Sequence, residues 1–517
     1  MIPKTMSTQH PDNATIPSWC KRELIEGEDE IYEAYFAFKD LNCQEVMWDS
    51  EGKDVDTKVV RKLLEKYPEF FKEKVIGEDI RLTYRIPNPR VEEAEKKYLL
   101  ETLFNIPLQY DIATIFYGRK VIPIFEVILP LTTSSKEIIW LSKLYSKMIG
   151  SLEDLELDSQ TKAKEWVGEI EPKRINVIPL VEDYQSLIEV RSIVEPYLEI
   201  LSPKTIRVFL ARSDPALNYG LIPAVLLVKI ALSELKKLSE TTGIKIYPIL
   251  GAGALPFRGN LNPKNLEKFL EEYKGIYTIT IQSALKYDYD LETSRNFIKE
   301  LNERLPAGEA RVIENKDLLI KVIDKFIERY NFWIEKIAPL VNSLALYVPE
   351  RRTRKLHIGL FGYSRRVGKV SLPRAIPFVA SLYSLGLPPE LISLDVLRDL
   401  KEEDYNLIME NYKNFREDLS FSCKYFSWRA IDLLRNSSET YKLLGINKET
   451  LLSFLDYMES LASFSELNLG IKVGARDLRE IKHENLINNL IISLFEGKKE
   501  EVKKNLVEAG KVRRSLG

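Results

Sequence analysis

Short runs of β-branched and aromatic residues alternate with longer amphipathic segments through the first three-quarters of the chain. The short runs are typical of buried strands, and the segments between them repeat apolar residues at helical spacing. The predicted strands are 44–48, 80–86, 121–129, 176–181, 206–211, 245–250, 277–281 and 357–361. The predicted helices among them are 56–74, 91–104, 136–148, 184–198, 221–238 and 262–273.

Strand followed by helix, repeated to eight strands, predicts an α/β fold of the (β/α)₈ TIM-barrel type. An open, doubly wound sheet is the alternative that the same pattern allows. The stretch 289–356 is far longer than one crossover needs, which indicates a helical insertion, and the sequence after Leu372 is almost wholly helical. We expect a single catalytic domain over 1–517, with barrel strands within about 44–366, inserted helices over 289–356 and a helical C-terminal region over 372–517.

The charge balance argues against a nucleic-acid-binding surface. Lysine and arginine number 75 against 77 acidic residues, a net charge of −2, whereas such surfaces carry a basic excess. No apolar run is long enough to span a membrane, and the start of the sequence lacks the layout of a signal peptide. We therefore expect a soluble, cytoplasmic protein. The 29% charged content with few cysteines and methionines fits a thermophilic protein.

The cysteines and histidines restrict which metals the chain can bind. Three distant cysteines, Cys20, Cys43 and Cys423, form neither a disulfide framework nor a zinc motif. Only three histidines are present, so a site built from several histidines is nearly excluded. A metal would rest on carboxylates, which favours magnesium or manganese.

Polar side chains follow most of the predicted strands, where barrel enzymes carry their chemistry. Carboxylates from two adjacent strands can share one divalent cation, and arginines can face an anionic, phosphorylated substrate. Along the chain, these side chains are Asp49 with Glu51 to Asp54, Arg85, Glu182 with Asp183, Arg212 with Asp214, Arg258 with Gly259, Gln282, Tyr363, Arg365 and Arg366, and the third strand itself carries Glu126.

Structural interpretations compete with these functional ones. A carboxylate after a strand is often a helix N-cap, which Asp183 or Asp214 could be. For Glu182 and Asp214 together, on consecutive strands, we favour metal binding. The pairs Arg351-Arg352 and Arg365-Arg366 could be solvated faces, and we interpret Arg351-Arg352 that way. An isolated histidine such as His10 is more often a surface or hydrogen-bonding residue than a catalyst.

The sequence resembles phosphoenolpyruvate carboxylase in its short archaeal form along nearly its whole length. Ser7-Thr8-Gln9-His10-Pro11 is similar to the segment of the family that carries its catalytic histidine. Val177 to Glu182 resembles the strand that ends in the first metal carboxylate, and Arg212-Ser213-Asp214 resembles the Tyr-Ser-Asp that holds the second. Phe257-Arg258-Gly259 resembles the arginine-glycine loop. Further matches are Met47-Trp48-Asp49, Glu51-Gly52-Lys53-Asp54, Arg374-Ala375-Ile376-Pro377 and the tail from Arg513 to Gly517.

Two positions depart from the long enzymes of the family. Leu217 stands where they carry a lysine, and Ala252 stands where they carry the first loop arginine. Lys53, Arg85, Arg212 or Arg366 could replace the missing cations. The chain is also much shorter, which puts the allosteric sites of the long form in doubt.

The resemblance implies that phosphoenolpyruvate and bicarbonate become oxaloacetate and phosphate, through carboxyphosphate and an enolate stabilised by the metal, replenishing the tricarboxylic acid cycle. It implies Mg²⁺ (or Mn²⁺) as the cofactor, on Glu182 and Asp214, and a homotetramer. The catalytic residues would be His10 and Arg258. The substrate-binding residues would be Arg85, Arg212, Arg365, Arg366, Arg374, Gln282 and Lys53.

Two other classes of function stay open. Another barrel lyase or mutase acting on phosphoenolpyruvate or a 2-oxo acid would keep the carboxylate-bound metal, but would need neither His10 nor bicarbonate. A non-catalytic, metabolite-binding barrel would need none of these groups. Bicarbonate-dependent formation of oxaloacetate separates the three.

Overall fold

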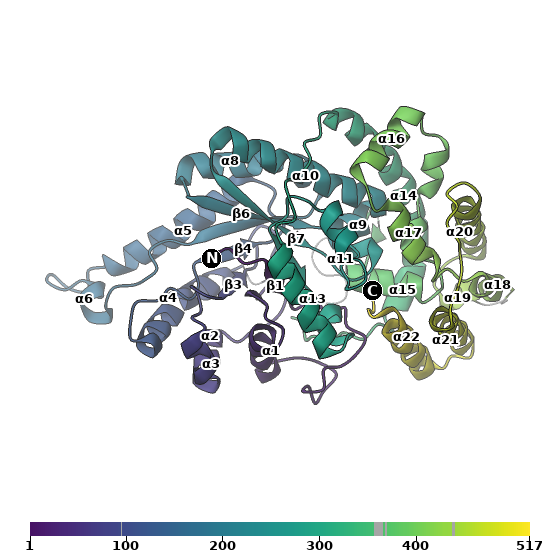
Figure 1. Cartoon of the computed structure of the whole chain (residues 1–517). Coiled ribbons are helices and arrows are strands. Elements are labelled where there is room, and N and C mark those ends of the chain that lie inside the picture. The colour runs from purple at the N-terminus through teal and green to yellow at the C-terminus, as the bar shows by residue number, and fades with distance from the viewer. Residues whose placement is uncertain (95, 356–365, 368–369, 437–439) are drawn as a thin grey trace.

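Eight parallel strands close into a barrel in the order β1 to β8, in a computed structural model that describes residues 1–517 except 95, 356–365, 368–369 and 437–439 (Figure 1). The predicted (β/α)₈ barrel is confirmed, and the open sheet is excluded. The strands are Thr5–Ser7, Glu45–Asp49, Arg81–Arg85, Glu126–Leu129, Asn176–Val181, Thr205–Ala211, Lys245–Gly251 and Thr278–Ile281.

The strand that closes the barrel is β1, near the start of the chain, and not the predicted strand 357–361. Met6 of β1 pairs with Glu45 of β2 on one side and with Thr280 of β8 on the other. The range 357–361 lies outside the described residues, and the place that we gave it is taken by β1. The prediction was wrong because Thr-Met-Ser is too short and too polar to show the alternation of a strand. His10, expected before the first strand, therefore follows it.

Strand β4 begins later than predicted, at Glu126 rather than at residue 121. Pro123 has no backbone N–H for a strand ladder, so the apolar run before Glu126 is not part of the sheet. Glu126 consequently lies at the amino end of its strand, where Arg81 and Arg207 contact its carboxylate and Arg207 also binds Glu45. This ion cluster is at the base of the barrel, away from the carboxyl ends of the strands. Grouping Glu126 with the side chains at the strand ends was wrong.

Helices cover the barrel close to where the amphipathic spacing predicts them, except that the helix predicted over 91–104 lies over Tyr98–Tyr117. Proline begins a second helix at Pro68, and a break after Ile188 divides the segment that follows β5. The helices up to the end of the barrel are α1 (Glu28–Lys39), α2 (Val59–Lys66), α3 (Pro68–Glu73), α4 (Tyr98–Tyr117), α5 (Ser135–Glu153), α6 (Ala163–Val167), α7 (Tyr184–Ile188), α8 (Val190–Leu201), α9 (Ser213–Tyr219), α10 (Leu221–Thr242), α11 (Leu266–Glu272) and α12 (Ser283–Tyr287), with the short turn η1 (Pro256–Arg258).

The remaining helices follow the last barrel strand, and all but the first of them gather along one side of the barrel (Figure 1). The segment expected as an insertion holds helices α13 (Leu291–Arg304) and α14 (Lys316–Ala345), but it comes after the last barrel strand and interrupts nothing. A two-stranded ribbon, β9 (Arg366–Val367) and β10 (Val370–Ser371), precedes the C-terminal helices. These are α15 (Ala375–Tyr383), α16 (Glu402–Asn411), α17 (Phe415–Cys423), α18 (Trp428–Asn436), α19 (Thr440–Leu443), α20 (Lys448–Leu467), α21 (Leu478–Phe495) and α22 (Lys499–Arg513), with the turns η2 (Pro389–Leu391) and η3 (Leu394–Arg398).

Three apolar clusters account for the packing of the described residues, and the smallest holds Cys20, Ile25 and Tyr287. Eight side chains that include Met6, Met47 and Phe209 form a small cluster within the barrel. A much larger cluster runs from the barrel helices into the C-terminal helices, so these parts share one core. No helix in the described ranges is long and apolar enough to cross a membrane.

Candidate active site

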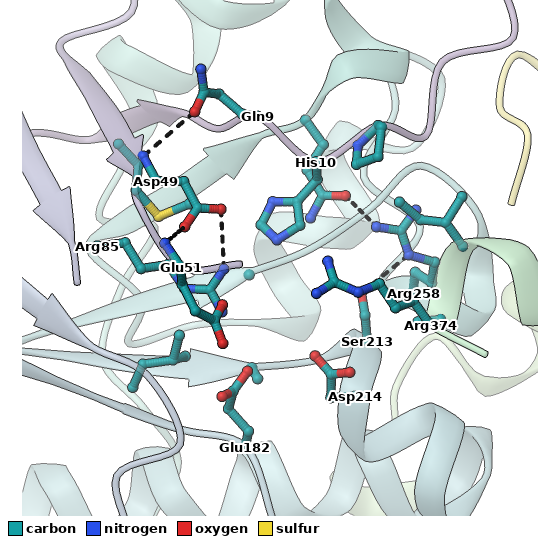
Figure 2. Close-up of a pocket in the computed structure, with 18 of the residues that line it drawn as sticks. Gln9, His10, Asp49, Glu51, Arg85, Glu182, Ser213, Asp214, Arg258 and Arg374 are labelled. Carbon is teal, nitrogen blue, oxygen red and sulfur yellow. Dashed lines mark hydrogen bonds and ion pairs between the residues drawn. The ribbon is translucent and has the colours of Figure 1, made fainter. Parts of the chain in front are cut away.

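A pocket lies at the carboxyl ends of the barrel strands. All nine predicted site residues whose side chains the structure describes line it, including both metal candidates. Figure 2 shows the carboxylates and guanidinium groups of this barrel-mouth pocket converging from separate strands. The polar residues that line it are Gln9, His10, Asp49, Glu51, Lys53, Arg85, Glu182, Arg212, Ser213, Asp214, Arg258, Gln282, Arg352, Arg354 and Arg374.

The two predicted metal carboxylates come from neighbouring strands. Glu182 follows β5 and Asp214 follows β6, and these strands pair through Val181 and Leu210. Figure 2 shows both carboxylates pointing into the pocket. Oε2 of Glu182 accepts a hydrogen bond of 2.9 Å from the amide of Leu131, which fixes the orientation of the side chain.

The helix-cap alternative holds for one aspartate and not for the other. Oδ1 of Asp183 accepts from the amide of Ser186 at 2.9 Å, so Asp183 is the N-cap of α7. Asp214 lies one position inside α9, whose N-cap residue is Arg212, and Asp214 lines the pocket. The cap explanation therefore does not account for Asp214.

Arg85 lies between the acidic groups of the pocket. Its guanidinium pairs with Asp49 at 3.2 Å and with Glu51. Burial by itself would lower the pKa of Arg85, but the carboxylates of Glu51, Asp49, Glu182 and Asp214 raise it above its ordinary value. Burial likewise opposes ionisation of Asp49, whereas Arg85 and Lys53 hold its pKa below the usual range. Arg85 is thus a permanent cation held by the acidic side chains around it.

His10 extends from the end of β1 into the pocket (Figure 2). Burial lowers its pKa well below the ordinary value, and the positive charges of Arg85, Arg258 and Arg354 lower it further, against the opposing effect of Asp49. The imidazole is therefore neutral near pH 7, in the form that can accept a proton.

Arg258 is buried, with 1% of its surface exposed, and is held by the protein through four hydrogen bonds. Nε donates to Ser213, Nη1 to Asp12 and to the carbonyl oxygen of Gly517, and Nη2 to Gln282. The loop has no room for another side chain, because a Cβ at Gly253 would lie 2.9 Å from Cζ of Arg258. The glycine therefore lets the arginine lie flat against its own loop.

The other predicted substrate-binding residues differ in what they contact. Arg212 lines the pocket, but its guanidinium donates to Tyr273 and to the carbonyl oxygens of Pro256 and Phe257, so it holds the loop of Arg258. Lys53 is buried and donates to Gln9 and Glu30.

Gln282 accepts from Arg258, and Arg374 lines the pocket at the N-cap position of α15. Arg366 begins β9, and its side chain is not described. Arg365 and Tyr363 lie outside the described residues.

The structure brings in site residues that we did not select. Gln9 and Arg354 line the pocket, and Asp12 pairs with Arg258 at 3.1 Å. The interpretation of Arg351-Arg352 as a solvated face was wrong, since 4% and 1% of their surfaces are exposed. Arg352 is buried because it pairs with Glu33 of α1 at 2.6 Å, and a contact between residues so far apart leaves no local pattern in the sequence. A polar run beside His10 was the one signal that could have indicated Gln9 and Asp12.

Charge and donor type favour an anionic ligand together with a hard cation. Among the described residues, seven lysine and arginine side chains and four carboxylates line the pocket. Carboxylate oxygens suit Mg²⁺ or Mn²⁺. Within the described ranges, no three histidine, cysteine or acidic side chains are placed to hold a metal together. A cation on Glu182 and Asp214 would thus take its other ligands from water or substrate, which is how magnesium is usually bound.

Comparison with known proteins identifies the family. A family model described as phosphoenolpyruvate carboxylase matches residues 2–517. This chain belongs to the phosphoenolpyruvate carboxylase family. The phosphoenolpyruvate carboxylase of Metallosphaera sedula is 49% identical over 518 aligned residues, which cover 100% of this chain and 99% of that protein. The one from Caldivirga maquilingensis is 45% identical, with 100% of each covered, and the one from Methanothermobacter thermautotrophicus is 49% identical over 82% of this chain and 87% of its own length.

The family assignment confirms the resemblance that the motifs indicated, down to its archaeal form. It makes the chain an enzyme of the phosphoenolpyruvate carboxylase family and sets aside the non-catalytic barrel. The two departures from the long enzymes are packed into the core: Leu217 and Ala252 are both 0% exposed. Cations that line the pocket from other elements include Lys53 and Arg85.

Proposed function

We propose that this chain carboxylates phosphoenolpyruvate with bicarbonate, giving oxaloacetate and phosphate and so replenishing the tricarboxylic acid cycle. The observation that carries the proposal is the convergence of three groups at one barrel mouth. These are the carboxylate pair Glu182 and Asp214, the neutral His10, and the excess of guanidinium groups. The carboxylate pair would hold the ion that stabilises the enolate, His10 would accept the proton, and the guanidinium groups would bind the phosphoryl group.

Glu182 and Asp214 would hold one Mg²⁺ or Mn²⁺ ion. When bound, the ion supplies a positive charge that stabilises the developing enolate oxygen. The chain contributes orientation, since the hydrogen bond from the amide of Leu131 to Glu182 keeps that carboxylate turned into the pocket.

Arginines would bind the phosphoryl group and stabilise its transfer to bicarbonate, with Arg258 foremost. Ser213, Asp12 and Gln282 hold Arg258 in one orientation, so little reorganisation is needed when the charge develops. We assign substrate contacts also to Lys53, Arg85, Arg374 and Gln282, which line the pocket. We keep the same assignment for Arg365 and Arg366 on the sequence prediction alone. Arg212 would act indirectly, by holding the loop that carries Arg258.

His10 would be the base of the second half of the reaction. The carboxyl proton of carboxyphosphate moves to the imidazole, the bond from its carbon to the bridging oxygen breaks, and the electron pair stays with phosphate. Carbon dioxide is then released next to the enolate, whose carbon forms the new bond. Water must be excluded, because protonation of the enolate gives pyruvate. The buried loop 252–260, which carries Arg258, would provide that cover.

We further propose that the chain works as one catalytic domain, in a cytoplasmic homotetramer. Large apolar side chains on the outer surface support assembly, because exposed apolar patches mark protein contacts. Ile115 of α4, Trp140 of α5 and Trp166 of α6 have 81%, 65% and 79% of their surfaces exposed.

The deciding assay is oxaloacetate formation from phosphoenolpyruvate, measured with and without bicarbonate. We expect oxaloacetate and phosphate in equal amounts, and neither in the absence of bicarbonate. A barrel lyase or mutase would convert its substrate without bicarbonate, and that result would reject the proposal.

A further inference from the structure

The side chain of Thr8 lies behind His10 as seen from the pocket. Its hydroxyl oxygen is 2.8 Å from Nδ1 of His10. Thr8 is 0% exposed and does not line the pocket, whereas His10 does. One ring nitrogen of the histidine is therefore engaged by the protein interior, which leaves Nε2 for the pocket.

The backbone of Thr8 is fixed on both sides. Its amide donates to the carbonyl oxygen of Ile281 in β8 at 3.0 Å. Its carbonyl oxygen accepts from Nζ of Lys286, a fully buried lysine, at 2.8 Å. The hydroxyl that contacts His10 thus sits on a part of the chain that the barrel and a buried cation hold in place.

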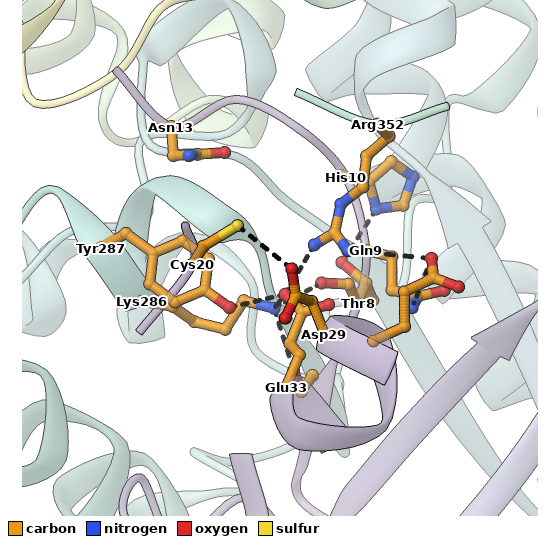
Figure 3. A network of polar contacts seen from close by, with 12 residues as sticks. Thr8, Gln9, His10, Asn13, Cys20, Asp29, Glu33, Lys286, Tyr287 and Arg352 are labelled. Carbon is orange, nitrogen blue, oxygen red and sulfur yellow. Dashed lines mark hydrogen bonds and ion pairs between the residues drawn. The ribbon is translucent and has the colours of Figure 1, made fainter. Parts of the chain in front are cut away.

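Lys286 is itself held by a carboxylate that collects three donors (Figure 3). Oε1 of Glu33 accepts from Lys286 at 2.8 Å, from the hydroxyl of Tyr287 at 2.6 Å and from Arg352 at 2.6 Å. These four residues form the Glu33 cluster. Burial opposes ionisation of Glu33, but Arg352 and Lys286 hold its pKa far below the usual range, so the cluster stays charged.

The charges that face His10 decide which ring nitrogen carries the proton. Arg85, Arg258 and Arg354 act on the imidazole from the pocket, and Asp49 is the one carboxylate among its main charged neighbours. An N–H directed at guanidinium groups is unfavourable, whereas a lone pair directed at them is favourable. The hydroxyl of a threonine can accept a hydrogen bond, so the proton has a partner at Nδ1.

We propose that Thr8 is a positioning residue that accepts the Nδ1 proton of His10 and thereby keeps Nε2 unprotonated toward the pocket. The inference rests on the proposed function, because it names the nitrogen that takes the proton of carboxyphosphate. That proton goes to Nε2, the carbon–oxygen bond to phosphate breaks with its electron pair on phosphate, and Nδ1 keeps its proton throughout. Thr8 never touches the substrate.

A substitution series separates positioning from folding. Thr8→Val removes the hydroxyl at nearly constant volume, and Thr8→Ser keeps it. The matched control is Thr5→Val at the start of β1, three residues before Thr8. Thr5 is also 0% exposed and bonds through its hydroxyl to Asn302 and to the amide of Gln44, away from the pocket. We expect Thr8→Val to lower oxaloacetate formation roughly tenfold, the effect of losing one buried hydrogen bond. Pyruvate should rise as a share of product, because slower release of carbon dioxide leaves the enolate more time to be protonated.

Recovery of the normal product ratio in Thr8→Ser, and a normal ratio in Thr5→Val, would support the positioning role. Equal product ratios in Thr8→Val and Thr5→Val would overturn it, because both variants would then report only damage to the strand.

A spectroscopic measurement tests the same inference without any turnover. The chain has three histidines, so ring ¹⁵N labelling gives few signals, and His10→Asn identifies those of His10. We expect a protonated Nδ1 and an unprotonated Nε2 in the wild type, and a mixed or reversed state in Thr8→Val. A proton on Nε2 in the wild type overturns the inference, even if Thr8→Val does not fold. If the enzyme formed no oxaloacetate, the proposed function would fail while the protonation state could still be determined.

Discussion

The carboxylate of Asp12 lies 3.1 Å from the guanidinium of Arg258, and both side chains are almost fully buried. The contact joins the segment after β1 to the loop after β7. Oδ1 of Asp12 also accepts from the amide of Ala284 at 2.7 Å, so α12 is part of the same junction. Asp12 thereby connects the segment after β1, the loop after β7 and helix α12 at the mouth of the barrel.

Asp12→Asn should destabilise the fold and reduce activity together. The asparagine can still accept from Ala284, but Arg258 would lose its anionic partner, and a buried charge left unpaired costs about 3–5 kcal/mol. Burial raises the pKa of Asp12, and the positive charge of Arg258 opposes that shift in part. Urea unfolding and kcat/KM measure the two effects.

The matched control for Asp12 is Asp288→Asn. Asp288 is only partly exposed and accepts from the amides of Ala14 and Thr15, so backbone donors take the place that an arginine has at Asp12, and desolvation raises its pKa to about 7. We expect a smaller loss of stability there and a kcat/KM near that of the wild type. Equal losses of stability and of kcat/KM in both variants would show that the contact between Asp12 and Arg258 contributes no more than an ordinary buried hydrogen bond.

The Glu33 cluster should make stability sensitive to acid. Arg352 and Lys286 hold the pKa of Glu33 below its value in an unfolded chain, about 4.3. A carboxyl with a depressed folded pKa stabilises the protein above its unfolded pKa, and this contribution is lost as the pH falls toward the folded pKa. The difference in Tm between wild type and Glu33→Gln should therefore be constant near pH 7 and shrink below about pH 4.3. A constant difference down to pH 3 would contradict this account.

The metal assignment predicts loss of both ion binding and turnover when either ligand is changed. Glu182→Gln and Asp214→Asn keep the shape of the side chains and remove one charged donor each, so Mn²⁺ affinity measured by electron paramagnetic resonance should fall at least tenfold. Oxaloacetate formation should fall with it. Asp183→Asn is the control, because an asparagine can still cap α7. Wild-type Mn²⁺ affinity in either ligand variant would remove that residue from the site.

Local sequence patterns predicted most of the barrel, because buried strands and amphipathic helices have distinct periods. They failed at β1, since three residues are too few to show a period. This strand is held by pairing with β8, its neighbour in the barrel but distant in the sequence. The carboxylates at the ends of β5 and β6 were predictable because consecutive parallel strands place their carboxyl ends together.

The partners of the site residues could not be predicted in the same way. Arg352 with Glu33, and Asp12 with Arg258, meet only through the closed barrel. Arg212 shows the opposite case: its position after a strand was predicted, but the direction of its guanidinium depends on the loop carbonyls that it meets. Position along a strand is a local property, whereas the direction of a long side chain is not.

Assembly can be tested by mass. A homotetramer should scatter light as about four chains of 59.9 kDa, and Trp166→Glu should lower the mean mass if α6 is part of a contact between copies. Trp166 has 79% of its surface exposed in a single chain, so the substitution should leave Tm of the isolated subunit unchanged. A mass of one chain for the wild type at working concentration would reject the tetramer.

His10→Asn is the most direct test of the mechanism. If the imidazole takes the proton of carboxyphosphate, its loss should affect the second half of the reaction more than the first. The phosphoryl group is transferred before that proton moves, and the arginines that face it are unchanged. The variant should then consume phosphoenolpyruvate slowly, still in a bicarbonate-dependent way, and release pyruvate because the waiting enolate is protonated.

A histidine with only a structural role would lower both products in parallel or leave both unchanged, so the product ratio is the decisive quantity and the total rate is not. Thr5→Val serves here too as a measure of damage to β1, since its side chain bonds away from the pocket. Wild-type yield and rate of oxaloacetate in His10→Asn would take the residue out of the mechanism. The same variant, assayed for phosphate release, shows whether transfer to bicarbonate still precedes the failed step.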